Sequence, residues 1–89
     1  MKQVKFNELI KGEWYWLYHA NSRIFLFLKY LKTSNGDQYC RRYFHYVLEY
    51  SELKRVSFRE TEECEISQNG TMYKASEDEV LLFGLIEEL

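Results

Sequence analysis

The segment from Arg23 to Lys32 constrains the fold more than any other part of the chain, because it is apolar on both of its sides when extended. Side chains along a strand point alternately to opposite faces of a sheet. The two sides of this segment carry Phe25, Phe27 and Leu31, and Ile24, Leu26, Leu28 and Tyr30, respectively. An antiparallel strand with one solvated face alternates between apolar and polar residues. We therefore expect a strand that other parts of the chain cover on both faces.

Aromatic and β-branched segments separated by turn signals predict the rest of a sheet. The expected strands lie within residues 13–74 and cover 13–20, 23–32, 38–50, 55–59, 63–67 and 71–74. Asn35-Gly36 is typical of a two-residue hairpin turn, and Asn69-Gly70 indicates a second hairpin. Asn21-Ser22 and residues 51–54 are the other expected connections. The length of the 38–50 strand predicts a bend or a bulge part-way along it.

Both ends of the chain carry helix signals. Residues 7–12 predict one short helical turn, with Asn7 as its cap and Gly12 at a left-handed stop position. Ser76 to Glu79 form a capping box, which predicts a helix over about 76–88. Its apolar residues recur at helical spacing and form one stripe that we expect to be buried: Leu82, Leu85, Ile86 and Leu89, widened by Val80 and Phe83. Because a helix of about 13 residues is marginal alone, we expect it to dock on the outer face of the doubly apolar strand.

These elements predict a single α+β domain over residues 1–89: a small curled antiparallel sheet or an SH3-like β-barrel with one C-terminal amphipathic helix. The composition supports a packed core, since 46% of the residues are hydrophobic and 18% are aromatic. Each buried aromatic side chain removes about 150–250 Å² from water. A chain of 89 residues is shorter than the usual domain of about 100–150 residues, so no second domain is expected.

The net charge of −2 conceals an uneven distribution. Residues 1–59 carry 11 Lys or Arg against 5 Asp or Glu, whereas residues 60–89 carry 1 against 9. Such a division indicates an interaction surface, unless the fold brings the two parts together and partly neutralises them. Residues 1–8 contain no apolar stretch that directs secretion, and the longest apolar run, Ile24–Leu28, is far shorter than the roughly 20 residues of a membrane span. We expect a cytoplasmic protein without membrane contact.

Four possible metal ligands, His19, Cys40, His45 and Cys64, match a zinc site in number but not in spacing. Cys40 and His45 are five residues apart on one expected strand, so their side chains point to opposite faces. The same geometry excludes them as a nucleophile–base pair unless a bulge intervenes. There is no glycine-rich phosphate loop and no strained serine elbow, and the acidic run 60–65 is typical of a solvated edge. We expect no enzyme activity, no metal and no cofactor.

The most promising binding residues lie on the 38–50 strand, where aromatic and cationic side chains are interleaved. They are Tyr39, Arg41, Arg42, Tyr43 and His45. Strict alternation places Tyr39, Arg41, Tyr43 and His45 on one face and Arg42 on the other. Trp, Tyr and Arg dominate the energetics of protein interfaces, so this surface predicts a protein-binding module. If the C-terminal helix docks only partly, its apolar stripe can also mediate a symmetric homodimer.

The same surface has an alternative interpretation as a site for nucleic acid or a nucleotide-derived signal. Arg41 or Arg42 can pair with phosphate, and an aromatic ring can stack on a base. Three cations of the neighbouring strand would extend such a platform: Arg23, Lys29 and Lys32. Against this, the chain is acidic as a whole, whereas dedicated nucleic-acid binders are usually basic.

Two segments resemble parts of known small proteins. Phe6 to Gly12, followed by an aromatic strand, looks like the opening of many small SH3-like barrels. The segment Tyr73 to Val80 is similar to an Ala-(Thr/Ser)-x-(Glu/Asp)-Glu helix start that recurs in short uncharacterised proteins of bacteriophages and prophages. The resemblance implies a phage-encoded protein, located in the cytoplasm of the host cell. It also implies a binding function directed at a host or virion protein, such as antagonism of host defence.

Overall fold

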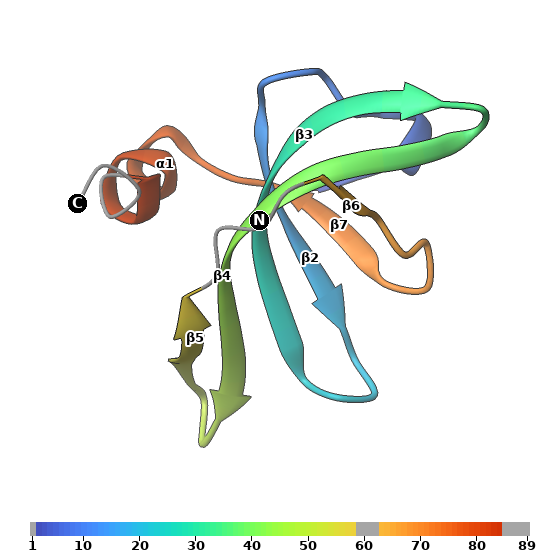
Figure 1. Ribbon diagram of the computed structural model, residues 1–89. Coiled ribbons are helices and arrows are strands. Elements are labelled where there is room, and N and C mark those ends of the chain that lie inside the picture. Colours follow the sequence, from blue (N-terminus) through green and yellow to red (C-terminus); the bar gives the residue numbers. More distant parts are fainter. Residues whose placement is uncertain (1, 59–62, 85–89) are drawn as a thin grey trace.

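An antiparallel sheet makes up most of the computed structural model (Figure 1). The backbone is described for residues 2–58 and 63–84, and the side chains for all of these except 42–45, 55–58 and 83–84. The elements are β1 (Lys2–Val4), η1 (Phe6–Glu8), β2 (Trp14–His19), β3 (Ile24–Ser34), β4 (Asp37–Glu49), β5 (Glu52–Phe58), β6 (Cys64–Glu65), β7 (Thr71–Lys74) and α1 (Glu77–Gly84). None of the helices among these residues is long and apolar enough to cross a membrane.

The strands follow the order β1-β7-β2-β3-β4-β5, and β6 pairs with the first half of β4. The predicted small α+β fold, an antiparallel sheet with one C-terminal helix, is confirmed. The sheet is not closed into a barrel, because β1 and β5 stand at the two ends of the strand order in the described chain. Figure 1 shows the long β3–β4 hairpin bending sharply, so that its tip and its base run in different directions.

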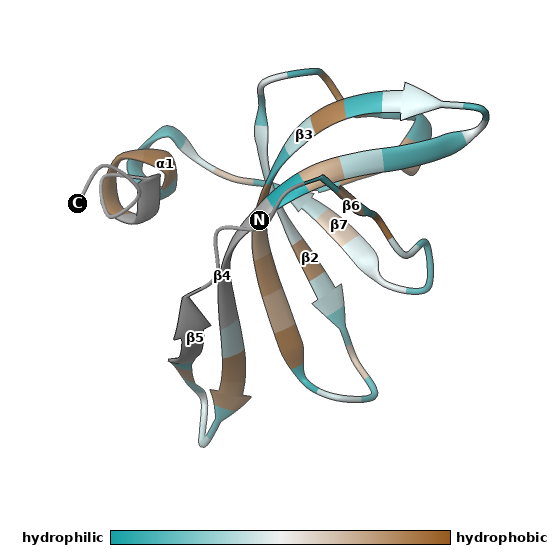
Figure 2. Cartoon of the chain, in the orientation of Figure 1, coloured by the Kyte–Doolittle hydropathy of each residue, from teal (hydrophilic) through white to brown (hydrophobic). Residues whose placement is uncertain are grey.

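Both faces of β3 are covered, as the doubly apolar segment predicts. The inner face holds a cluster of Tyr15, Leu17, Leu26, Leu28, Tyr30, Cys40, Ile66 and Met72. The opposite face, called here the aromatic face, holds Trp16, Phe27, Tyr46 and Ala75, against which Trp14, Phe25, Tyr73 and Val80 pack. Figure 2 shows apolar residues along the first half of β3 and hydrophilic residues toward the tip of the β3–β4 hairpin.

Two β-bulges bend the β3–β4 hairpin. Phe27 pairs with Phe44 and Leu28 with Arg42, which leaves Tyr43 as an extra residue on β4. Nearer the tip, Leu31 is an extra residue on β3, between the pairs that Tyr30 and Lys32 make. A bulge bends its strand and increases its twist. The prediction of a bulge within residues 38–50 is therefore confirmed.

The turns follow local backbone preferences in part. Asn35 and Gly36 have φ angles of 54° and 82°, as the predicted two-residue hairpin turn requires. Gly12 is left-handed as expected, with φ at 86°. The prediction of Asn7 as a helix cap is wrong, because η1 begins at Phe6 and its cap is Lys5.

Two other connections and one strand differ from the predictions. The expected connection over 51–54 is only Tyr50-Ser51, and β5 already begins at Glu52. Asn69-Gly70 is not a hairpin turn, because β6 pairs with β4 whereas β7 pairs with β1 and β2. The expected strand 63–67 is reduced to Cys64–Glu65. The next residue, Ile66, still donates its N–H to the Gln38 carbonyl of β4, and its side chain joins the inner-face cluster.

Helix α1 begins as the capping box predicts. The Ser76 N–H donates to Glu79 Oε1 at 2.9 Å, and the Glu79 N–H donates to Ser76 Oγ at 3.1 Å. The expectation that Leu82 is buried is wrong, since 66% of its surface is exposed. Among the described side chains of α1, Val80 packs on the aromatic face, and Leu82 lies about 200° around the helix from it. Leu85, Ile86 and Leu89 of the predicted stripe lie outside the described residues, and nothing is described of the Phe83 side chain.

Candidate binding surface

Three side chains form a row across β2, β3 and β4 at one end of the aromatic face. Trp14 is directly opposite Lys29, and Lys29 is directly opposite Arg41. Residues that oppose each other in an antiparallel ladder point to the same face. The Lys29 ammonium lies 5.7 Å from the centre of the Trp14 ring, within the range of a cation–π contact. Arg41 is half-buried, with its Nε atom inside the surface.

A second cation–aromatic pair lies next to this row. Lys32 is opposite Tyr39, and the Lys32 Nζ atom is 5.8 Å from the centre of the Tyr39 ring. Tyr39 and Arg41 flank the buried Cys40, so both point away from the inner face. We call Trp14, Lys29, Lys32, Tyr39 and Arg41 the basic–aromatic surface.

The bulge at Leu31 brings the two lysines of this surface together. In an uninterrupted strand, residues 29 and 32 point to opposite faces, because side chains alternate with a period of two. The extra residue shifts the register, so that Lys32 opposes Tyr39 while Lys29 opposes Arg41. Sequence reasoning included both lysines only in the nucleotide alternative and omitted Trp14. The pattern of alternating residues holds no signal for a bulge at this position.

Carboxylates of the C-terminal third lie beside the basic–aromatic surface. Glu63 Oε2 is 3.1 Å from Lys32 Nζ, and about half of each side chain is exposed. Glu65 on β6 is directly opposite Tyr39 on β4. The fold therefore brings Glu63 and Glu65, from the acidic residues 60–89, next to this surface. Glu63 partly neutralises the charge of Lys32, which belongs to the basic residues 1–59.

Two of the five sequence-predicted binding residues belong to this surface, namely Tyr39 and Arg41. The side chains of Arg42, Tyr43 and His45 lie outside the described part of the structure, although their backbone positions in β4 are described. In the backbone register His45 opposes Leu26 and Arg41 opposes Lys29, with the bulge at Tyr43 between the two positions. The prediction that Tyr39, Arg41, Tyr43 and His45 share one face assumed unbroken alternation, and for Tyr43 and His45 it concerns side chains outside the described part of the structure.

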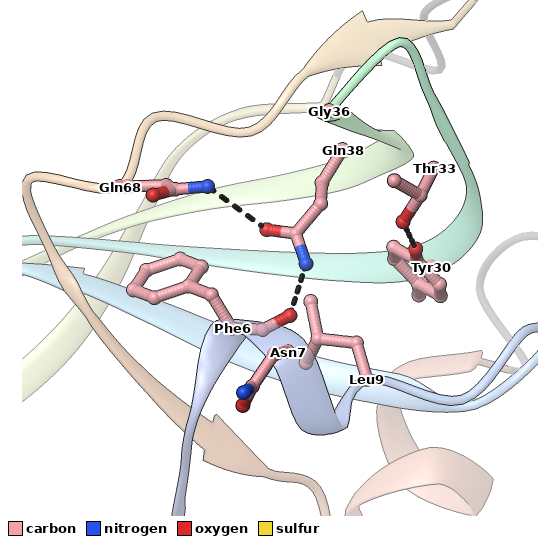
Figure 3. Close-up of a pocket in the computed structure, with 8 residues that line it drawn as sticks. All are labelled: Phe6, Asn7, Leu9, Tyr30, Thr33, Gly36, Gln38 and Gln68. Atoms are coloured by element: carbon pink, nitrogen blue, oxygen red, sulfur yellow. Dashed lines mark hydrogen bonds between the residues drawn. The ribbon is translucent and has the colours of Figure 1, made fainter.

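A pocket of about 560 Å³ opens on the other side of the hairpin, between its tip and η1 (Figure 3). Its wall consists of Phe6, Asn7, Leu9, Tyr30, Thr33, Gly36, Gln38 and Gln68. Gln38 is buried; its amide NH₂ donates to the Phe6 carbonyl, and its Oε1 accepts from Gln68 Nε2 at 3.4 Å. The hydroxyl groups of Tyr30 and Thr33 are hydrogen-bonded to each other.

This pocket supplies amides, hydroxyls and apolar surface. No carboxylate, amine, imidazole or thiol is among the described residues that line it. The amide of Gln38 is already engaged in holding η1 and Gln68 against β4. Among the side chains that the structure describes, which exclude that of His45, no three His, Cys, Asp or Glu residues gather as metal ligands would.

The basic–aromatic surface must be interpreted from this chain alone. No model of a known protein family matches the sequence, and no curated protein and no solved structure is significantly similar to it.

Proposed function

We propose that this chain is a non-enzymatic binding module that engages a protein partner through the basic–aromatic surface. The row of Trp14, Lys29 and Arg41 carries the proposal. Trp, Tyr and Arg are the residue types on which interface energies concentrate, and three of the five residues of the surface are of these types. Strands hold the backbone of all five in fixed register, so no backbone order has to be gained on binding.

The carboxylates beside this surface favour a protein partner over a polyanion. Glu63 already forms an ion pair with Lys32, and Glu65 lies opposite Tyr39. A phosphate backbone would have to approach both carboxylates, whereas a protein surface with charges of both signs can complement cations and carboxylates together. The net charge of −2 acts in the same direction.

The resemblance of one segment to phage proteins indicates the class of protein to which the partner belongs. The resemblance of Tyr73 to Val80 to phage and prophage proteins implies that the chain acts inside an infected cell. A host or virion protein is then the expected partner, and antagonism of a host defence protein is one role of this kind.

The second candidate is a protein that binds nucleic acid or a nucleotide signal with the same surface. Two cation–aromatic pairs on one face favour it, because bases stack on rings while cations hold phosphates. A native mass spectrum and an A260/A280 ratio of one purified sample separate the candidates. Extra mass with raised absorbance at 260 nm supports the nucleotide reading; a mass that fits the bare chain or its dimer, with ordinary absorbance, supports protein binding.

The surface itself is tested by substitution once a partner has been captured and purified. We expect Lys29→Ala with Lys32→Ala, or Arg41→Ala, to weaken binding by about tenfold or more, as interface hot spots do. Lys54→Ala is a matched control, because Lys54 is also exposed and ion-paired, with Glu49 at 3.3 Å. If all variants bound the partner as tightly as wild type, the assignment of the basic–aromatic surface as the binding site would be wrong. A steep loss of wild-type binding with rising salt would favour phosphate as the ligand.

A further inference from the structure

Cys40 and Cys64 are directly opposite each other where β6 pairs with β4. Both are thiols, and no disulfide joins them. The Ile66 N–H donates to the Gln38 carbonyl at 2.7 Å, which marks 38 and 66 as a hydrogen-bonded pair of this ladder. Such pairs recur every two residues, so 40 and 64 form the next one, with Cα atoms about 5.5 Å apart. This distance lies within the range of about 4.4–6.8 Å that a disulfide requires.

We propose that Cys40 and Cys64 are a reversible disulfide-forming pair that responds to low-molecular-weight disulfides such as glutathione disulfide. Opposed residues point to the same face with Cβ atoms about 4.5–5.5 Å apart, and a disulfide needs about 3.5–4.5 Å. Because 40 and 64 form a hydrogen-bonded pair, their Cβ atoms lie near the upper end of the first range, and the required approach is about 1–2 Å. Such a shift is feasible for β6, which has only two residues. A bond formed under such strain is more easily reduced than a relaxed structural one.

The unequal burial of the two residues sets the order of reaction. Cys40 is 1% exposed and Cys64 is half-buried, so the Cys64 thiolate is the group that reaches the oxidant. It attacks one sulfur of glutathione disulfide, the S–S bond breaks, and one glutathione leaves as the thiolate. The Cys40 thiolate then attacks Cys64 Sγ and releases the second glutathione. The protein loses two protons and two electrons, and one glutathione disulfide becomes two glutathione molecules.

The experiment equilibrates the full chain in buffers with different ratios of reduced to oxidised glutathione, blocks the remaining thiols, and determines intact masses. We expect wild type to become a monomer that lacks two hydrogens, without bound glutathione. Cys40→Ala should stop at the mixed disulfide on Cys64, and Cys64→Ser should leave Cys40 unmodified in the folded protein. Persistent glutathione on wild type, a disulfide-linked dimer, or identical behaviour of wild type and Cys40→Ala would each overturn the proposal.

A denatured control separates the geometry of the pair from the mere presence of two thiols. The same titration in concentrated guanidinium chloride measures closure of the flexible loop between residues 40 and 64. We expect the native equilibrium constant for disulfide formation to exceed the denatured one by at least about tenfold, because the sheet holds the two residues opposite each other. Equal or lower values in the native protein would show that the register does not favour the bond.

Discussion

Gly70 directly precedes β7, beside the end of β2, where Thr71 pairs with Tyr18. A Cβ atom at this position would be 2.7 Å from the Tyr18 carbonyl oxygen and 2.8 Å from Leu17 Cδ1. The carbonyl belongs to the β2 backbone and cannot move aside without disturbing the sheet. We expect Gly70→Ala to lower the free energy of unfolding by about 1–3 kcal/mol, measured by urea denaturation.

The control for this substitution is Gly36→Ala, whose Cβ would meet nothing within 4 Å. It carries only the cost of a left-handed conformation, at φ of 82°, which is about 1–2 kcal/mol. Asn substitutions distinguish the two causes of instability. Asn tolerates the left-handed region better than Ala does, but its side chain is larger than that of Ala. We expect Gly36→Asn to regain stability and Gly70→Asn to lose more of it. Recovery by Gly70→Asn would contradict the steric explanation.

Glu79 joins the start of α1 to the aromatic face. Its Oε1 atom accepts from the Ser76 N–H, and its Oε2 atom accepts from Trp16 Nε1 at 2.8 Å. Glu79→Gln replaces one acceptor oxygen by an NH₂ group, which cannot accept from either N–H. We expect a loss of about 1–2 kcal/mol of unfolding free energy together with a change in Trp16 fluorescence. Glu77→Gln removes the same charge from the same turn and should change stability by less than about 0.5 kcal/mol.

The β4–β5 hairpin turns through two residues without a glycine. Tyr50 and Ser51 have φ angles of 51° and 64°, and this conformation strongly favours Asn-Gly. Ser51→Gly should therefore raise the free energy of unfolding by up to about 1 kcal/mol, because it relieves left-handed strain. Ser34→Gly, at an extended position of β3, should lower it instead. Thermal unfolding of the two variants checks the opposite signs.

The sequence predicts those elements whose signals are local. The Asn35-Gly36 turn and the Ser76–Glu79 capping box each depend on a few neighbouring residues, and both form as expected. The turn at Tyr50-Ser51 has no such signal, because neither residue is typical of a left-handed turn. The positions of the bulges at Leu31 and Tyr43 depend on the pairing register between β3 and β4, which involves residues far apart in the sequence. For this reason the sequence identified Tyr39 and Arg41 but not the face that they share with Lys29, Lys32 and Trp14.

At the scale of the whole molecule, the two clusters cannot unfold separately, because they occupy opposite faces of the same three strands. Each of β2, β3 and β4 contributes residues to both clusters. On the inner face these are Tyr15, Leu26 and Cys40, and on the aromatic face they are Trp16, Phe27 and Tyr46. We expect one cooperative transition in urea. In a Cys64→Ser variant, tryptophan fluorescence reports the aromatic face and labelling of Cys40 reports the inner face. Their midpoints should coincide, and separate midpoints would contradict the shared-strand account.

The position of β7 between β1 and β2 has a consequence for synthesis on the ribosome. Lys2 to Val4 pair with Met72 to Lys74, and most of β2 also pairs with β7. Neither β1 nor this edge of β2 can be paired before β7 has been synthesised. The nascent chain can form the β2–β3–β4 meander early, but the strand that covers the edge of β2 emerges only after β5 and β6. Until then that edge and the tyrosines and leucines of the inner face are open to other chains. The cell must therefore either complete this stage of synthesis quickly or cover the exposed edge with a chaperone, so that the incomplete sheet does not associate with other chains.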